Sequence, residues 1–224
     1  MSPWEKEVIA QERGMRAPNH PRGWDLVGKG PVVFVGSSIW NLWRDLLKHM
    51  APIPTVNSAF GGSRTWEVLE FMDRNVLPYR PRLIVYYCGS NDVNHHSRAR
   101  TSEQEAARAI RNNFAAFVQR VHAALPECRI IFASIIRAPE KQKRWSLVDL
   151  ANRLVEEYCS SQRLCRYLDL HTALEDRRGR PRMELYVEDK LHYRREAYAS
   201  FREVVRPAVE AALKEAAAPP PSRL

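Results

Sequence analysis

The sequence lacks any apolar run of the roughly 20 residues that a membrane-spanning helix needs. Its first residues, MSPWEKEVIAQERGMR, include acids and no hydrophobic segment, so they do not resemble a secretory signal. We therefore expect a cytoplasmic protein that is not integral to a membrane. Its 224 residues are 45% apolar and 27% charged, which suits one globular domain with a substantial core.

Cysteine is scarce, and its spacing does not favour a metal site. The sequence contains Cys88, Cys128, Cys159 and Cys165, which form no CxxC pair and no cluster with histidine at zinc-binding spacing. We interpret them as buried free thiols, although an even number also permits a disulfide. We predict no bound metal.

Positive charge is in excess, but it is not concentrated anywhere. The formal net charge is +9, which favours anionic partners in general. No long run of Lys and Arg occurs, and no nucleic-acid-binding motif is recognisable. We therefore expect no nucleic-acid partner, and a nucleic-acid-binding domain remains an alternative that rests on charge alone.

Short apolar runs alternate with amphipathic stretches along the chain. The runs are rich in β-branched and aromatic residues and predict buried strands at 32–36, 54–60, 83–89, 128–136 and 166–170. Helical patterns cover 63–77, 101–125, 148–164 and about 194–215, and Ser102 with Glu105 has the spacing of a capping box. The alternation predicts an α/β fold, a three-layer α/β/α sandwich around a mostly parallel five-stranded sheet.

The two ends of the chain differ from this pattern. We expect an N-terminal arm at residues 1–28 that packs on the domain through Trp4 and Trp24. The domain itself would span 29–215. Residues 216–224 are rich in proline and are predicted to be a disordered tail.

Small and polar residues gather where the predicted strands end, which is where parallel sheets bind ligands. GSS (36–38) follows the first strand, GGS (61–63) the second and GSND (89–92) the third, and DKLH (189–192) precedes the last helix. Each is weak alone, because serine often caps a helix and Gly-Gly often forms a turn. Together they supply the nucleophile, base, carboxylate and oxyanion donors of acyl transfer.

The order and spacing of these segments resemble the SGNH, or GDSL, hydrolase family over about residues 31–208. GSSIWNLW is similar to its first block, NSAFGGS to the second, RPRLIVYYCGSND to the third and VEDKLHYRREAY to the last. The chain is most similar to bacterial-type GDSL acylhydrolases, which also resemble the catalytic subunits of platelet-activating-factor acetylhydrolase. The resemblance implies a flavodoxin-like fold and a serine esterase that needs no cofactor.

The resemblance also assigns the catalytic roles. Ser38 stands at the nucleophile position of the first block, and helix capping is the alternative role for it. His192 would be the general base, oriented by Asp189. Two features depart from the family pattern: Ser37 stands where the family more often has Asp, and the run Tyr193–Ala197 makes the neighbourhood of the base unusually basic.

The oxyanion hole would consist of three donors. These are the backbone N–H groups of Ser38 and Gly62 and the side-chain amide of Asn91. Gly61 is adjacent and is the alternative to Gly62.

Other polar residues lie near the same edge. Asp92 to His95 is a second Asp-x-x-His segment; we expect His95 and His96 to be a solvated loop pair, with a substrate-facing role as the alternative. The basic loop 136–145 either faces an anionic substrate or, as we favour, is solvated. The candidate substrate contacts are Ser37, Arg64, His95 and Arg137.

We therefore predict a serine esterase that cleaves carboxylic esters through an acyl-enzyme on Ser38. No insertion is long enough to form a lid, so short or exposed acyl groups of small-molecule, lipid or carbohydrate esters would fit. The alternative is a weakly active member of the fold that binds a ligand or partner. The sequence does not indicate the oligomeric state.

Overall fold

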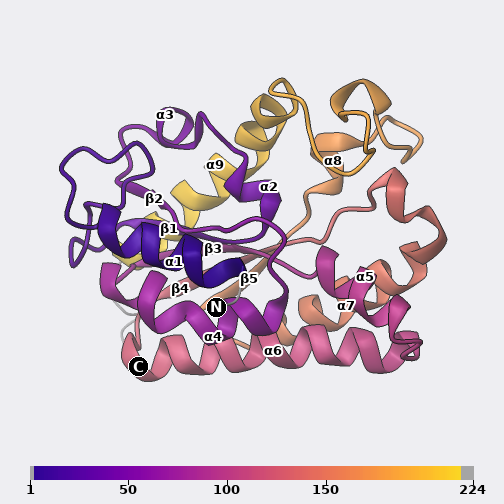
Figure 1. Ribbon diagram of the computed structural model, residues 1–224, viewed down its shortest axis with the longest axis horizontal. Helices are drawn as coiled ribbons and strands as arrows, with labels where there is room; N and C mark the ends of the chain where they lie inside the picture. The colour runs from indigo at the N-terminus through magenta and orange to yellow at the C-terminus, as the bar shows by residue number, and fades with distance from the viewer. Residues whose placement is uncertain (1–2, 218–224) are drawn as a thin grey trace, which may run out of the picture.

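The computed structural model of the protein describes residues 3–217, and its centre is one parallel sheet (Figure 1). The strands are β1 (Val32–Gly36), β2 (Thr55–Asn57), β3 (Leu83–Tyr87), β4 (Arg129–Ala133) and β5 (Cys165–Leu168). They pair in the order β2-β1-β3-β4-β5, and every pair is parallel. This confirms the predicted α/β architecture.

Helices connect the strands and cover the sheet. The α-helices are α1 (Pro3–Gly14), α2 (Ser38–Asn41), α3 (Leu46–Met50), α4 (Thr65–Asn75), α5 (Ser90–Arg98), α6 (Glu103–Ala124), α7 (Trp145–Ser160), α8 (His171–Leu174) and α9 (Ala197–Ala217). Short 3-10 helices are η1 (Leu77–Tyr79), η2 (Pro139–Arg144) and η3 (Met183–Leu185).

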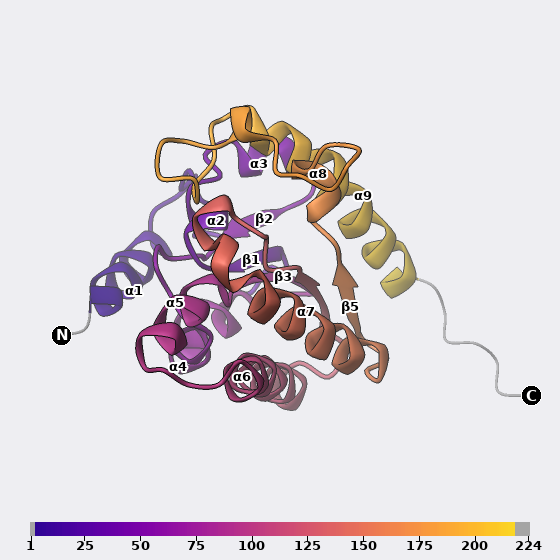
Figure 2. The ribbon, with the colours of Figure 1, turned by 90° about the vertical axis from the view of Figure 1, so that its right-hand side faces the viewer.

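The sheet separates two hydrophobic cores, because successive side chains of a strand point to opposite faces. Val33 and Val35 of β1 pack in one core with residues of α1, α4, α6 and α7. Val32 and Phe34 pack in the other with residues of α2, α3, α8 and α9. Figure 2 shows these two helical layers on either side of the sheet.

Part of the expected arm is helical. Residues 3–14 form helix α1, which lies against α4 with Val8 buried. Trp24 is buried and Trp4 packs on the core, as expected. At the other end, α9 continues to Ala217, and the rest of the predicted tail, 218–224, lies outside the described residues.

The strand order brings the functional segments together. Because β1 lies between β2 and β3, the carboxyl ends of these three strands adjoin at one edge of the sheet. The segments that follow them, 36–38, 58–64 and 89–92, are therefore neighbours in space although they are distant in sequence.

Two further expectations concern the cysteines and the membrane-spanning helices. Cys88, Cys128, Cys159 and Cys165 are all free and buried, as we expected. Between residues 3 and 217, no helix combines the length and apolar character required to cross a bilayer.

Candidate active site

Ser38 stands at the sharp turn that ends β1. Gly36 has a φ of +133°, and a methyl group on it would lie 1.8 Å from the carbonyl oxygen of Tyr87 on β3. Only glycine allows this approach. The Ser37 N–H donates to the same carbonyl at 3.0 Å, and Ser38 then opens α2 with a partly exposed side chain. The turn thus presents the Ser38 hydroxyl at the edge of the sheet.

His192 reaches this hydroxyl from the far end of the chain. Its Nε2 lies 2.9 Å from Ser38 Oγ, and its Nδ1 lies 2.6 Å from Asp189 Oδ2. A carboxylate can only accept, so Nδ1 carries the hydrogen and Nε2 is free to accept the serine proton. Ser38, His192 and Asp189 therefore have the geometry of a catalytic triad.

Asp189 is held by a tight turn. Its Oδ1 accepts from the backbone N–H groups of Leu191 at 2.9 Å and His192 at 2.8 Å, and Lys190 between them has a φ of +57°. Partial burial opposes ionisation, but the hydrogen bonds from the His192 backbone and ring and from the Leu191 backbone outweigh it and lower the pKa of Asp189. The carboxyl therefore stays ionised when it orients His192.

The predicted oxyanion donors lie at the same edge. Gly62 has a φ of +74°, a left-handed conformation that favours glycine. Within residues 3–217, the backbone N–H groups of Ser38 and Gly62 donate to no other protein group. The Asn91 Nδ2 donates one hydrogen to the Ser63 carbonyl at 3.0 Å, which leaves its second hydrogen available.

Asp92 fixes the segment that carries Gly62. It is fully buried, and its carboxylate accepts from the Thr65 N–H at 3.1 Å and the Thr65 hydroxyl at 2.5 Å. Burial raises the pKa of Asp92 to about 6, although the bonds from Thr65 act in the opposite direction. Thr65 begins α4, so Asp92 joins the first turn of α5 to the first turn of α4.

The remaining candidate substrate contacts differ in access. Ser37 is 1% exposed, and its hydroxyl has no partner among the described residues, which argues against contact with a substrate. Arg64 and His95 lie together, with Nη1 and Nδ1 3.3 Å apart, and the Arg64 guanidinium covers Trp66. Arg137 is ion-paired with Asp149 at 2.6 Å. Arg64 is also ion-paired, with Glu67 at 2.6 Å, so ion pairing does not separate it from Arg137. Arg64 and His95 are the better placed pair because they closely follow Gly62 and Asn91 in the chain.

Two expectations about loops differ from the structure. His95 and His96 belong to helix α5, not to a loop. The basic segment 136–145 is only partly solvated: Lys143 is exposed, but Lys141, in η2, is fully buried with its Nζ 2.7 Å from Glu140. Glu140 pairs with the buried ammonium group of Lys141, and a buried charge needs such a partner.

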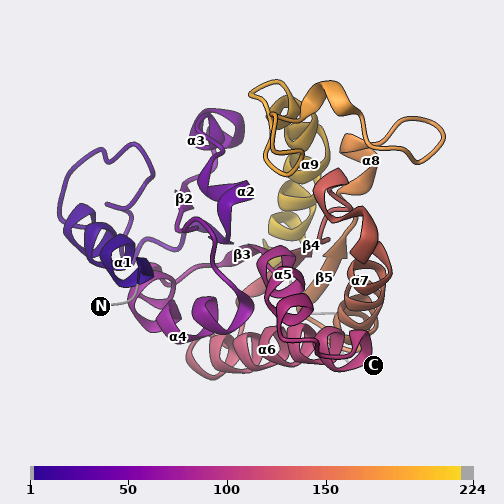
Figure 3. The ribbon, with the colours of Figure 1, turned by 45° about the vertical axis from the view of Figure 1, so that its right-hand side comes forward.

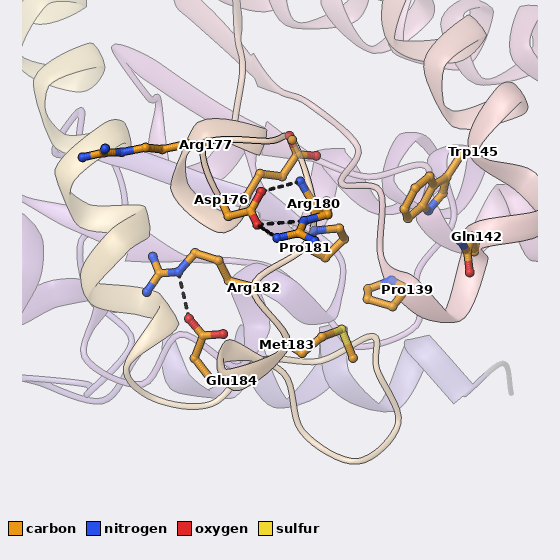
Figure 4. Close-up of a pocket in the computed structure, with 12 residues that line it drawn as sticks. Pro139, Gln142, Trp145, Asp176, Arg177, Arg180, Pro181, Arg182, Met183 and Glu184 are labelled. Atoms are coloured by element: carbon orange, nitrogen blue, oxygen red, sulfur yellow. Dashed lines mark hydrogen bonds and ion pairs between the residues drawn. The ribbon is translucent and has the colours of Figure 1, made fainter.

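A cavity with a volume of about 910 Å³ lies beyond η2. Figure 4 shows η2 and Trp145 facing the segment 176–184 across it. Its lining includes Pro139, Gln142, Trp145, Arg180, Pro181 and Met183. It includes no member of the triad and none of the three oxyanion donors, so the chemistry is centred elsewhere.

Comparison with known proteins gives a family and a fold. A model of the GDSL-like Lipase/Acylhydrolase family matches residues 26–199. A sequence search of curated proteins found no match.

Several solved structures share the fold. A protein from Streptococcus pneumonia named for platelet activating factor has a TM-score of 0.73 and 19% identity, and the alignment covers 92% of each chain. A GDSL-like lipase from Bacteroides thetaiotaomicron has a TM-score of 0.70 and 19% identity, covering 92% of this chain and 97% of that one. An acetylxylan esterase from Geobacillus stearothermophilus, solved as a catalytic mutant, has a TM-score of 0.62 and 14% identity, covering 81% and 92%.

Proposed function

Because the chain belongs to the GDSL-like lipase/acylhydrolase family, we propose that it hydrolyses carboxylic esters through an acyl-enzyme on Ser38. One observation carries the proposal: the continuous contact from Ser38 Oγ through His192 to Asp189, at 2.9 Å and 2.6 Å. Such a relay activates a hydroxyl that is otherwise a weak nucleophile.

The reaction would proceed in two halves. His192 Nε2 takes the Ser38 proton as Oγ attacks the ester carbonyl, and the resulting imidazolium is stabilised by Asp189. The oxyanion of the tetrahedral intermediate accepts hydrogen bonds from the Ser38 and Gly62 N–H groups and from Asn91. Collapse breaks the bond to the alkoxy oxygen, which receives the proton from His192.

Water completes the cycle. It gives a proton to His192 and attacks the acyl-enzyme carbonyl, and a second tetrahedral intermediate forms among the same donors. Its collapse releases the acid and returns the proton to Ser38 Oγ. No step requires a redox group or a metal.

The substrate would carry a short or exposed acyl group. Ser38 and His192 are both partly exposed, which supports access of such a group from solvent. An acetylxylan esterase shares the fold, and its catalytic mutants replace a serine in one structure and a histidine in another. We therefore propose acetyl esters, including those of carbohydrates, as the first compounds to assay.

The direct test compares two adjacent serines. We expect Ser38→Ala to lower kcat for p-nitrophenyl acetate by several orders of magnitude, because the nucleophile is lost. Ser37→Ala is the matched control and should retain most of the activity. If wild type gives no turnover, or if Ser37→Ala is the inactive variant, the proposal is wrong.

A further inference from the structure

Helix α1 covers the loop that carries Gly62. The helix precedes the family-matched residues 26–199 and lies beside α4 (Figure 3). Near its start, the ring of Trp4 occupies the space where residue 62 would place a side chain. A methyl group on Gly62 would lie 2.6 Å from Trp4 Cη2. Trp4 also packs on Phe60, with ring centroids 5.9 Å apart.

The Trp4 ring is fixed by a hydrogen bond. Its Nε1 donates to Glu67 Oε1 at 2.6 Å, and the Glu67 side chain is only 8% exposed. The other oxygen of Glu67 accepts from the backbone N–H of Arg64 at 2.8 Å. Trp4 is therefore joined to the first turn of α4, immediately after the glycine that it covers.

The rest of the N-terminal segment holds the start of the same loop. The Trp24 Nε1 donates to the Asn57 carbonyl at 2.7 Å, and the Gln11 Nε2 donates to the Ser58 hydroxyl at 3.0 Å. The Arg22 Nη2 donates to the Ala59 carbonyl at 2.6 Å. Residues 57, 58, 59 and 62 are thus each contacted by a side chain from the first 24 residues.

This arrangement matters because an oxyanion donor acts only when it is held in place before the reaction. Glycine has many accessible backbone conformations, and a left-handed glycine leaves its position easily unless neighbours exclude the others. We propose that Trp4 is a positioning residue for the Gly62 N–H. The inference rests on the proposed ester hydrolysis at Ser38.

The experiment compares three variants with wild type. Trp4→Ala removes the ring, and Glu12→Gln weakens the ion pair of α1 with Arg74 away from the site. Trp4→Phe keeps a smaller ring, which lacks both the N–H donor and the outer edge of the indole that contacts position 62. We expect Trp4→Ala to lower kcat for p-nitrophenyl acetate by about tenfold, less than the loss of a whole donor, with KM little changed. Trp4→Phe should restore part of kcat, and Glu12→Gln should leave it unchanged.

A measurement that needs no turnover accompanies the kinetics. In ¹⁵N–¹H spectra, the Gly62 amide resonance should shift or broaden in Trp4→Ala and stay in place in Glu12→Gln. An unchanged Gly62 resonance, wild-type kcat in Trp4→Ala, no restoration by Trp4→Phe, or an equal loss in Glu12→Gln overturns the inference. If wild type does not hydrolyse the ester, the proposed function fails, and the Gly62 resonance still decides whether Trp4 positions this amide.

Discussion

Asp92 is a carboxylate with no access to water, and its ionisation affects stability. Burial raises its pKa from 3.8 to about 6, so the folded state binds the proton more tightly than the unfolded state. Its contribution to the free energy of unfolding is therefore fully present below pH 3.8 and is lost as the pH rises through about 6.

Asp92→Asn should remove this dependence, because an amide does not ionise. Relative to wild type, the free energy of unfolding of the variant should rise between pH 4 and pH 7 by at most about 3 kcal/mol, at 1.36 kcal/mol per pKa unit. Urea unfolding at several pH values measures the difference. Asp73→Asn, at an exposed ion pair with Arg120, is the control for the loss of a carboxylate elsewhere on the protein. A pH-independent difference for Asp92→Asn would contradict the argument.

The Asn91 side chain should stabilise the transition state more than it strengthens substrate binding. In Asn91→Ala, the oxyanion loses a donor, so kcat should fall about a hundredfold or more while KM changes far less. Steady-state kinetics with p-nitrophenyl acetate separates the two. Asn94→Ala is the matched control on α5, since Asn94 accepts from Arg144 instead. An effect of Asn91→Ala on KM alone would place Asn91 in substrate binding.

At the scale of residues, the family resemblance predicted the catalytic side chains and the N–H donors, but not the groups that hold them in place. It named Ser38, Asp189 and His192, and the structure brings them into contact. Ser63 was not named, because it contributes a carbonyl that every residue type possesses. Thr65 was also missed. One of its two bonds to Asp92 comes from its backbone N–H, which does not depend on residue type, and the other comes from its hydroxyl.

The two Asp-x-x-His segments have the same spacing but lie in different secondary structure, and only one of them pairs its acid with its histidine. Asp189 and His192 lie in a turn, where the carboxylate reaches Nδ1. Asp92 and His95 lie on helix α5, where Asp92 is committed to Thr65 and His95 contacts Arg64 and Trp66. Only the turn leaves the imidazole oriented by an acid and facing Ser38.

We therefore expect His192→Ala to lose activity about as completely as Ser38→Ala. The double variant should be little worse than either single one, because the residues act as a unit. His95→Ala, the internal control, should stay within about tenfold of wild type, the scale of one lost contact. The measurement is kcat/KM for the same ester. Retained activity in His192→Ala with loss in His95→Ala would reverse the assignment.

Sequence periodicity located the long elements better than the short ones. Helix α6 was predicted from its apolar stripe, and Ser102 and Glu105 form the expected capping box. Helix α1 was missed because its buried side chains do not form an apolar stripe: Val8 is aliphatic, but Gln11 is polar. The second strand proved shorter than 54–60, since the chain leaves β2 after Asn57.

At the scale of the molecule, the sheet depends on how closely β1 and β3 approach. Gly36→Ala would place a methyl group 1.8 Å from the Tyr87 carbonyl and force a side chain into a φ of +133°. Both effects oppose pairing of the two central strands. We expect destabilisation of at least about 3 kcal/mol, seen as a lower urea midpoint or as loss of folded protein.

Gly61→Ala is the matched control for this substitution. Among the described residues, no atom beyond its two chain neighbours lies within 4 Å of a methyl group there, and Gly61 does not have a positive φ. Its unfolding midpoint should stay close to that of wild type. Similar midpoints for Gly36→Ala and wild type would show that the sheet tolerates the displacement.

The class of the fold was predictable and the order of its strands was not. Alternating apolar runs and amphipathic stretches indicate a parallel sheet with helices on both faces. They carry no information on which strands are neighbours. The position of β1 between β2 and β3 was implied only by the resemblance to a flavodoxin-like family, and the structure has that order. That position brings Ser38, Gly62 and Asn91 to one edge.

The proposed catalytic groups come from widely separated positions in the sequence, so a growing chain acquires them at different times during synthesis. Ser38, Gly62 and Asn91 are synthesised early, but His192 and Asp189 follow only after β5, and the adjoining Tyr193 and Tyr198 pack against Phe201 of α9. A ribosome-bound chain that ends before this region holds a serine without a base. On the proposed mechanism, esterase activity should therefore emerge late in synthesis, when the last helix has docked, and the unfinished chain should not acylate itself.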